Sequence, residues 1–183
     1  MSYAALWCKS NFSFLEGASH PSELVEQAAT LGLHAIALTD RDGVYGAVQA
    51  LLAAESTGAR LIIGSEISLD DGSTIILLCR TRKGYSNLCR LISAGRMRSP
   101  KGESKVSWEE VCSHSEGLLA LWGGDRSLLL RKADPDVVAR QLKEAFHDHL
   151  HVIISRHRRA DDVAKEALLR LRGQEDFVAV RGE

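Results

Sequence analysis

Short apolar runs alternate along the chain with longer stretches in which apolar residues recur every three or four positions. The compact runs predict strands at 4–8, 34–39, 61–64, 117–121, 150–154 and 177–180. The longer stretches predict helices from Pro21 to Gly32, over 44–52, over 88–92 with an end near Gly95, from Ser107, from Asp134 as N-cap with Pro135 at N1, and over 162–171. Because strands and helices alternate, we expect an α/β fold with a mainly parallel sheet, open or closed into a barrel.

One pair of strands departs from this alternation. The runs 66–69 and 73–79 flank Asp70-Asp71-Gly72, a typical turn sequence. No helix fits between them, so we expect the two runs to pair as a hairpin.

Composition restricts the classes of function without selecting one. The chain has 183 residues and a net charge of −1, which predicts a single domain over 1–183 and no globally basic nucleic-acid-binding surface. Its four cysteines are scattered without a CxxC pair. No leading signal segment and no apolar run of about 20 residues occurs, so we expect a cytoplasmic protein without membrane contact.

Two acidic residues follow neighbouring strands of the predicted sheet. Asp40 comes after the second strand and Glu66 after the third, at the edge where parallel α/β folds carry their active sites. Two carboxylates at this edge could hold a divalent metal or share acid–base work. The alternative is that Asp40 caps the next helix and Glu66 pairs with an arginine or lysine.

Three further features carry weaker hypotheses. His147, His149 and His151 alternate and would share one face of a strand as metal ligands, or His147 would simply end a helix. The turn-rich segment 96–105 could contact a nucleic-acid backbone, or be a solvated loop; its basic residues are Arg96, Arg98, Lys101 and Lys105. Ser10 and Ser13 lack a partner histidine, so a nucleophile role is weak.

Several segments together resemble a known family. The stretches SNFSFLEGASHPSELVEQAATLGLHAIALTD, LIIGSEISLDDG and RKGYSNLCRLIS are similar, in order and spacing, to the N-terminal PHP (polymerase and histidinol phosphatase) domain of bacterial family C DNA polymerases. The resemblance is closest to the error-prone type and extends also to the polymerase III alpha subunit. It implies a distorted (β/α)7 TIM-like barrel, incomplete here because the chain reads VAVRGE where the last metal motif of the family would follow.

The resemblance also implies that the metal site of the family is dismantled here. Two carboxylate ligands are kept and a late histidine matches weakly: Asp40, Glu66 and His157. Four ligand positions carry other residue types: Trp7, Lys9, Arg41 and Thr74. An indole cannot coordinate a metal, and a lysine or arginine places positive charge where a cation would sit. We therefore expect ion pairs, no catalytic residue, and no bound metal or other cofactor.

For function, the resemblance implies a parent protein that carries out error-prone DNA synthesis during DNA repair and replication. Its partners would be DNA, deoxynucleotides, a sliding clamp, other damage-tolerance proteins and the remainder of the polymerase. The chain is too short to contain the polymerase catalytic domains, so we expect a structural scaffold. The alternative is a zinc- or manganese-dependent phosphoesterase or exonuclease. An incomplete barrel would also expose a sheet edge that invites self-association.

Overall fold

The computed structural model describes residues 3–131, 135–155, 162–172 and 179–182. Its strands are β1 (Ala4–Cys8), β2 (Ala35–Leu38), β3 (Leu61–Ser68), β4 (Thr74–Cys79), β5 (Leu118–Gly123), β6 (Leu150–Ser155) and β7 (Ala179–Gly182). Its α-helices are α1 (Pro21–Thr30), α2 (Ala47–Thr57), α3 (Arg82–Arg98), α4 (Trp108–Ser113), α5 (Asp136–Phe146) and α6 (Asp162–Arg172). Two short 3₁₀ helices are η1 (Leu128–Leu130) and η2 (His147–His149).

The seven strands form one sheet in chain order, and β4 alone runs against the other six. The predicted hairpin is confirmed, since β3 and β4 pair antiparallel from Gly64 opposite Leu78 to Ser68 opposite Thr74. Its turn is held by Asp71, whose carboxylate accepts hydrogen bonds from the backbone and hydroxyl of Ser73. The reversed strand also makes the β4–β5 pair antiparallel, so the predicted mainly parallel sheet is mixed at this point.

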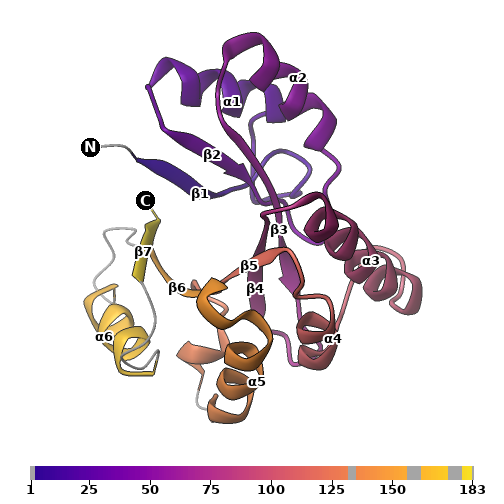
Figure 1. Cartoon of the computed structure of the whole chain (residues 1–183), viewed down its shortest axis with the longest axis vertical. Coiled ribbons are helices and arrows are strands. Elements are labelled where there is room, and N and C mark those ends of the chain that lie inside the picture. The colour runs from indigo at the N-terminus through magenta and orange to yellow at the C-terminus, as the bar shows by residue number, and fades with distance from the viewer. Residues whose placement is uncertain (1–2, 132–134, 156–161, 173–178, 183) are drawn as a thin grey trace.

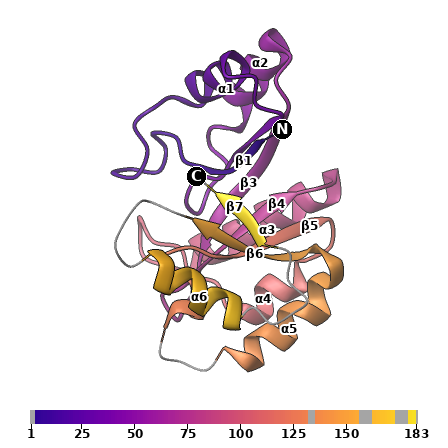
Figure 2. The same ribbon diagram turned by 90° about the vertical axis from the view of Figure 1, so that its left-hand side faces the viewer.

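The sheet curls into an incomplete barrel (Figures 1 and 2). Among the described residues, hydrogen-bonded pairing runs from β1 to β7 without joining these two strands, although they approach each other across the opening. This arrangement confirms the prediction of an α/β barrel that is incomplete at its last strands.

Three apolar clusters pack against the sheet, two of them on its outer face under the helices and one inside its curl. The largest lies between the sheet and α3, α4 and α5 and contains Leu77, Leu91 and Trp122, each almost fully buried. A second fills the inside of the curl with Ile76 and Ile153. The third packs α1 and α2 against the β1–β2 side. Figure 1 shows α1 and α2 side by side at one end, apart from the other helices.

Helix α3 is longer than the sequence predicted. It begins after Thr81, whose hydroxyl accepts a hydrogen bond from the Gly84 backbone, and continues past Gly95. A Cβ at Gly95 would lie 2.7 Å from the Ser104 hydroxyl, so this glycine permits a close approach rather than ending the helix. Arg96 and Arg98 therefore belong to the last helical turn, not to the expected loop.

Two sequence predictions fall partly on residues outside the described ranges. Asp134, the predicted N-cap of α5, lies outside them, and Pro135 stands at the N-cap position. The predicted strand at 177–180 corresponds to β7, of which residues 179–182 are described. Within the described part of the chain, no helix is both long and apolar enough to cross a lipid bilayer.

Candidate functional site

The site lies where β1, β2, β3 and β5 end, and a bulge in β1 shapes it. The β1–β2 register changes between Ala5 and Cys8, which places one extra residue on β1. As a result Leu6 and Trp7 both pack toward the inside of the curl, while Cys8 packs under α1. The bulge therefore turns the Trp7 side chain away from α1 and toward Glu66, to which its indole N–H donates a hydrogen bond.

Asp40 is almost fully buried just after β2, and it anchors the loop that follows β1. Its carboxylate accepts hydrogen bonds from the Ser10 backbone N–H at 2.8 Å, the Ser10 hydroxyl at 2.7 Å and the Ser13 hydroxyl at 2.6 Å. The Ser13 hydroxyl in turn accepts a hydrogen bond from the Arg41 backbone N–H. Asp40 thus does not cap the next helix, whose N-cap is Gly46. Both serines are structural partners of this carboxylate.

Glu66, almost fully buried in β3, is surrounded by cations. Lys9 and Arg126 pair with its two carboxylate oxygens, and the Arg126 Nη2–Glu66 Oε1 distance is 2.9 Å. Arg41 Nη2 lies 3.7 Å from Oε1, and the Trp7 indole N–H donates a hydrogen bond of 3.2 Å to Oε2. The buried charge is therefore compensated by side chains of this chain.

A second carboxylate, Glu16 in the β1–α1 loop, shares the same cations. It pairs with Lys9 and Arg41, and Arg126 Nη2 lies 3.7 Å away. Burial opposes ionisation of Glu16, but the hydrogen bonds from Lys9 and Arg41 outweigh it and hold the pKa below its ordinary value. The ion-pair cluster thus consists of Glu16, Glu66, Lys9, Arg41 and Arg126.

The sequence analysis missed Glu16 and Arg126. Arg126 stands 60 positions from Glu66, in the loop after β5, where no local pattern points to it. Gly124 in that loop has a φ of 81°, and a Cβ there would lie 2.9 Å from the Trp7 ring. The glycine lets the loop lie against Trp7, and so brings Arg126 to Glu66.

This arrangement does not fit a divalent metal. The carboxylate oxygens of Asp40 are used by serine donors, and those of Glu66 face an ammonium and two guanidinium groups. These cations would repel a metal ion, and neither they nor an indole can act as ligands. Among the described residues, no group of three or more His, Cys, Asp or Glu side chains could hold a metal.

The remaining predicted ligand positions lie apart from the cluster or outside the described ranges. Thr74 is buried at the start of β4, opposite Ser68 of β3. It lies two positions before Ile76, the residue of β4 that pairs with Glu66. Alternation along the strand places it on the same face as Glu66. His157 lies outside the described residues.

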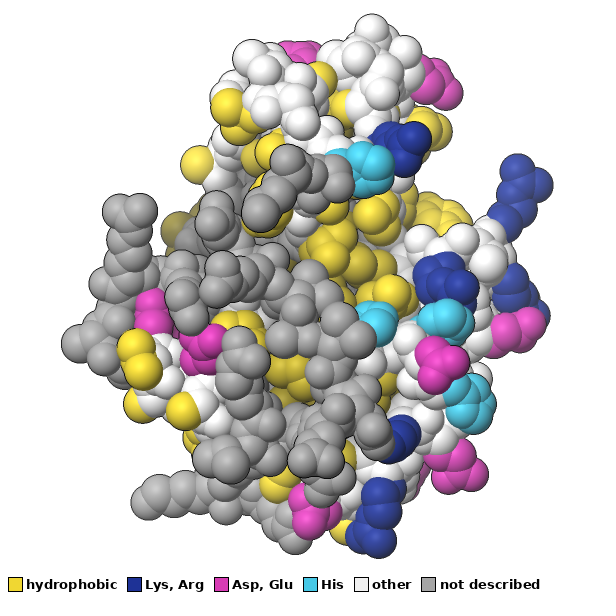
Figure 3. Space-filling view, turned by 60° about the vertical axis from the view of Figure 1, so that its left-hand side comes forward, with side chains coloured by type: hydrophobic (Ala, Val, Ile, Leu, Met, Phe, Trp, Pro, Cys, Tyr) yellow, Lys and Arg dark blue, Asp and Glu magenta, His cyan; other side chains and the backbone are white. Residues whose placement is uncertain are grey.

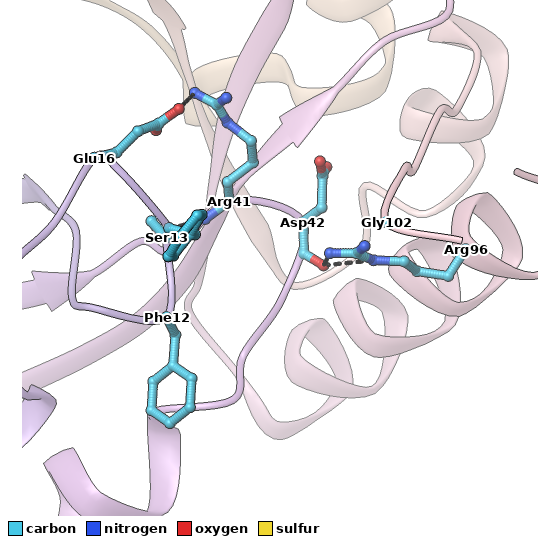
Figure 4. Close-up of a pocket in the computed structure, with 8 residues that line it drawn as sticks. Phe12, Ser13, Glu16, Arg41, Asp42, Arg96 and Gly102 are labelled. Atoms are coloured by element: carbon cyan, nitrogen blue, oxygen red, sulfur yellow. Dashed lines mark hydrogen bonds and ion pairs between the residues drawn. The ribbon is translucent and has the colours of Figure 1, made fainter. Parts of the chain in front are cut away.

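A hollow of about 210 Å³ adjoins the ion-pair cluster (Figure 4). Arg41 points toward Glu16 on one side, and Arg96 reaches from α3 to the backbone oxygen of Asp42, with an Nη2–O distance of 3.0 Å. Burial raises the pKa of Asp42 even though Ser68 donates two hydrogen bonds to its carboxylate. The hollow therefore contains both signs of charge, and its arginines already have partners.

The basic residues expected to contact nucleic acid are spread over α3 and the following turn. Arg98 pairs with Glu110 of α4, and Lys105 pairs with Glu103. Lys101 is exposed in the turn. Nucleic-acid contact by these residues stays a prediction.

The three alternating histidines do not share one face of a strand. His147 ends α5 and begins η2, and His151 lies in β6, so the alternating arrangement is wrong. Burial and the neighbouring His149 lower the pKa of His151. On the face drawn in Figure 3, histidine side chains lie next to hydrophobic and charged ones.

Comparisons with solved structures identify the same fold in two proteins of low sequence identity. One is a candidate metal-dependent phosphoesterase from Bifidobacterium adolescentis, with a TM-score of 0.67 and 19% identity, covering 99% of this chain and 86% of the other. The second is an amidohydrolase from Chromobacterium violaceum, with a TM-score of 0.63 and 18% identity, covering 100% and 87%.

Sequence relatives are considerably closer. The error-prone DNA polymerase of Rhodopirellula baltica is 38% identical over 177 residues, which are 93% of this chain and 16% of the relative. That of Pseudomonas aeruginosa is 42% identical over 163 residues, which are 89% of this chain and 15% of the relative. The chain thus spans about one sixth of the length of these polymerases. Residues 6–168 match the PHP domain, and this chain therefore belongs to the PHP domain family.

Proposed function

We propose that this chain is a non-catalytic PHP domain that serves as a structural scaffold in an error-prone DNA polymerase. The identity to such polymerases over most of the chain supports this family role. DNA synthesis itself would depend on the rest of such a protein, because the chain corresponds to about one sixth of it. Its partners would then be the remaining polymerase chain and its DNA, in the bacterial cytoplasm.

The observation that carries the scaffold role is the surroundings of Glu66. A buried carboxylate needs a positive partner, whether a metal ion or protein cations. Here Lys9 and Arg126 contact it directly and Arg41 lies nearby, so charge compensation requires no metal. The cluster joins the segments after β1, β2 and β5 to Glu66 within β3, so its role is to hold these parts of the fold together.

Metal titration tests this proposal. We expect the purified chain, dialysed against Zn²⁺ or Mn²⁺, to retain far less than one ion per molecule and to show the same Tm with and without EDTA. The informative control is a Trp7→His, Lys9→His, Arg41→His variant, which returns three imidazoles to the positions around Glu66. If this variant folds and gains metal, the three substituted positions explain the lack of affinity.

The competing function is a zinc- or manganese-dependent phosphoesterase or exonuclease. It would be supported by stoichiometric metal in the unchanged chain that is lost in Glu66→Gln, together with metal-dependent release of nucleotides from DNA. That pair of results would contradict the scaffold proposal.

A further inference from the structure

Helix α2 carries its large apolar side chains on the outside. Its buried residues are Ala50, Ala53 and Ala54, which pack in the layer shared with α1. On the opposite side Val48, Leu51 and Leu52 are 68%, 51% and 61% exposed. An isolated surface helix normally has the reverse pattern, with large apolar residues facing the core. Helices that are apolar all round are normally covered on both sides.

This outer side carries little charge, since Glu55, four residues after Leu51, is the one charged residue of α2 on it. The small alanines on the inner side pack in the layer that α2 shares with α1, and the larger residues stay on the outer side. The outer side therefore presents apolar area that the described part of the chain leaves in solvent.

The apolar surface continues beyond the helix into the loop after β1. Tyr45, just before α2, is 59% exposed, and its ring centroid lies 6.2 Å from that of Phe12 in the loop. Further along this loop Leu15 is 89% exposed. Its φ of 63° lies in the left-handed region, which raises the conformational energy of every residue type except glycine. We call the surface formed by Phe12, Tyr45, Val48, Leu51 and Leu52 the α2 face.

We propose that the α2 face is the surface on which the rest of the polymerase chain docks. This inference rests on the proposed function and adds the place of contact. The length of the relatives supports this choice of occupant: error-prone DNA polymerases similar to this chain contain about five sixths of their residues outside the matched segment. A partner of that size could cover a mainly apolar helix and the adjoining loop.

The size of the α2 face favours a tethered partner over a second copy. A helix of 11 residues is about 16 Å long. With one loop beside it, such a helix falls short of the roughly 800 Å² per partner that stable interfaces between free proteins bury. A domain in the same chain needs less area, because the covalent link supplies a high effective concentration.

A chimera tests the proposal. In it this chain replaces the matching segment of the Pseudomonas aeruginosa error-prone DNA polymerase, and amide hydrogen exchange is compared with that of the isolated chain. We expect exchange in α2 to slow about tenfold in the chimera while α5 changes little. Protection that appears elsewhere but not in α2 would overturn the docking site and leave the scaffold proposal standing. Protection nowhere would contradict the scaffold proposal itself.

Two matched substitutions provide the second readout. Val48 and Val137 are both the second residue of an 11-residue helix, and they are 68% and 57% exposed. In the chimera, Val48→Glu should remove the extra protection of α2, whereas Val137→Glu should preserve it. A dimer of the isolated chain in sedimentation experiments that Val48→Glu dissociates would assign the face to a second copy and overturn the proposal.

Discussion

The two halves of the curled sheet, β1–β2 with their helices and β3–β6 with theirs, differ in how they use apolar residues. The side covered by α3, α4 and α5 buries large side chains, including Leu77, Leu88 and a Trp108–Trp122 pair whose ring centroids are 6.0 Å apart. The end covered by α1 and α2 buries mainly alanines in its helices, together with Pro21 and Val25, and leaves larger residues outside. Only the first side resembles the core of an independent domain.

This difference indicates which part of the sheet stabilises the folded chain and which part is available to bind a partner. Close packing of large side chains supplies most of the hydrophobic free energy of folding, so the α3–α5 side should dominate the stability of the isolated chain. The α1–α2 end contributes less burial of its own. The ion-pair cluster lies between the two, since Lys9 and Arg41 come from one side, Arg126 comes from the other, and Glu66 in β3 joins them.

The largest expected effect is on the α3–α5 side. Leu77→Ala should lower the free energy of unfolding by about 4 kcal/mol, because it removes a fully buried side chain and leaves a cavity. Urea unfolding followed by circular dichroism measures this change. A loss below about 1 kcal/mol would show that this layer is not the principal core.

The next effect concerns the junction between the two sides. Glu66→Gln should cost about 3 kcal/mol, because it leaves Lys9, Arg41 and Arg126 without their buried counter-charge. The matched control is Glu116→Gln in the exposed pair with Lys83, where we expect less than about 0.5 kcal/mol. Equal effects of the two variants in urea unfolding would show that the cluster is no more than a surface feature.

A smaller effect should appear in acid. The pKa of Glu16 is lower in the folded protein than in the unfolded chain, where it is about 4.3. Ionised Glu16 therefore adds its full share to the free energy of unfolding above the unfolded pKa, and this share is lost as the pH falls through the folded pKa. Below about pH 5 the stability of the unchanged chain should therefore fall more steeply than that of Glu16→Gln. The contribution should stay under about 1 kcal/mol, because the pair is partly exposed. Parallel pH profiles of urea midpoints would contradict this role.

The smallest effect should come from the α2 face in the isolated chain. Leu51→Ala should change the free energy of unfolding by less than about 0.5 kcal/mol, since the side chain is 51% exposed and alanine favours the helix. The comparison with Leu77→Ala is direct, because both variants delete the same atoms. A cost above about 2 kcal/mol would mean that Leu51 is covered within this chain.

Local patterns were sufficient for much of the fold. Apolar runs located strands such as β2 and β6, and the Asp70-Asp71-Gly72 turn predicted the β3–β4 hairpin. The end of α3 was not predictable, because Gly95 normally weakens a helix. Here it permits contact with Ser104, a residue of a segment that packs there only in the folded chain.

The sequence by itself determined which chemistry Trp7, Lys9 and Arg41 cannot perform, since coordination depends on the atoms that a side chain carries. It also placed two acidic residues on adjacent strands, although Glu66 lies within β3 and not after it as predicted. The tertiary structure alone decided which donors reach each carboxylate. Serines from the loop after β1 donate hydrogen bonds to Asp40, and cations from three loops form ion pairs with Glu66.

The physical reason is that these contacts join residues far apart in the chain. The meeting of Arg126 with Glu66 depends on the curl of the sheet and on a tight approach at Gly124, neither of which a local pattern specifies. The exposure of Val48 and Leu52 has the same origin. Helical periodicity shows that both sides of α2 are apolar, but only the packed structure decides that the alanines face inward.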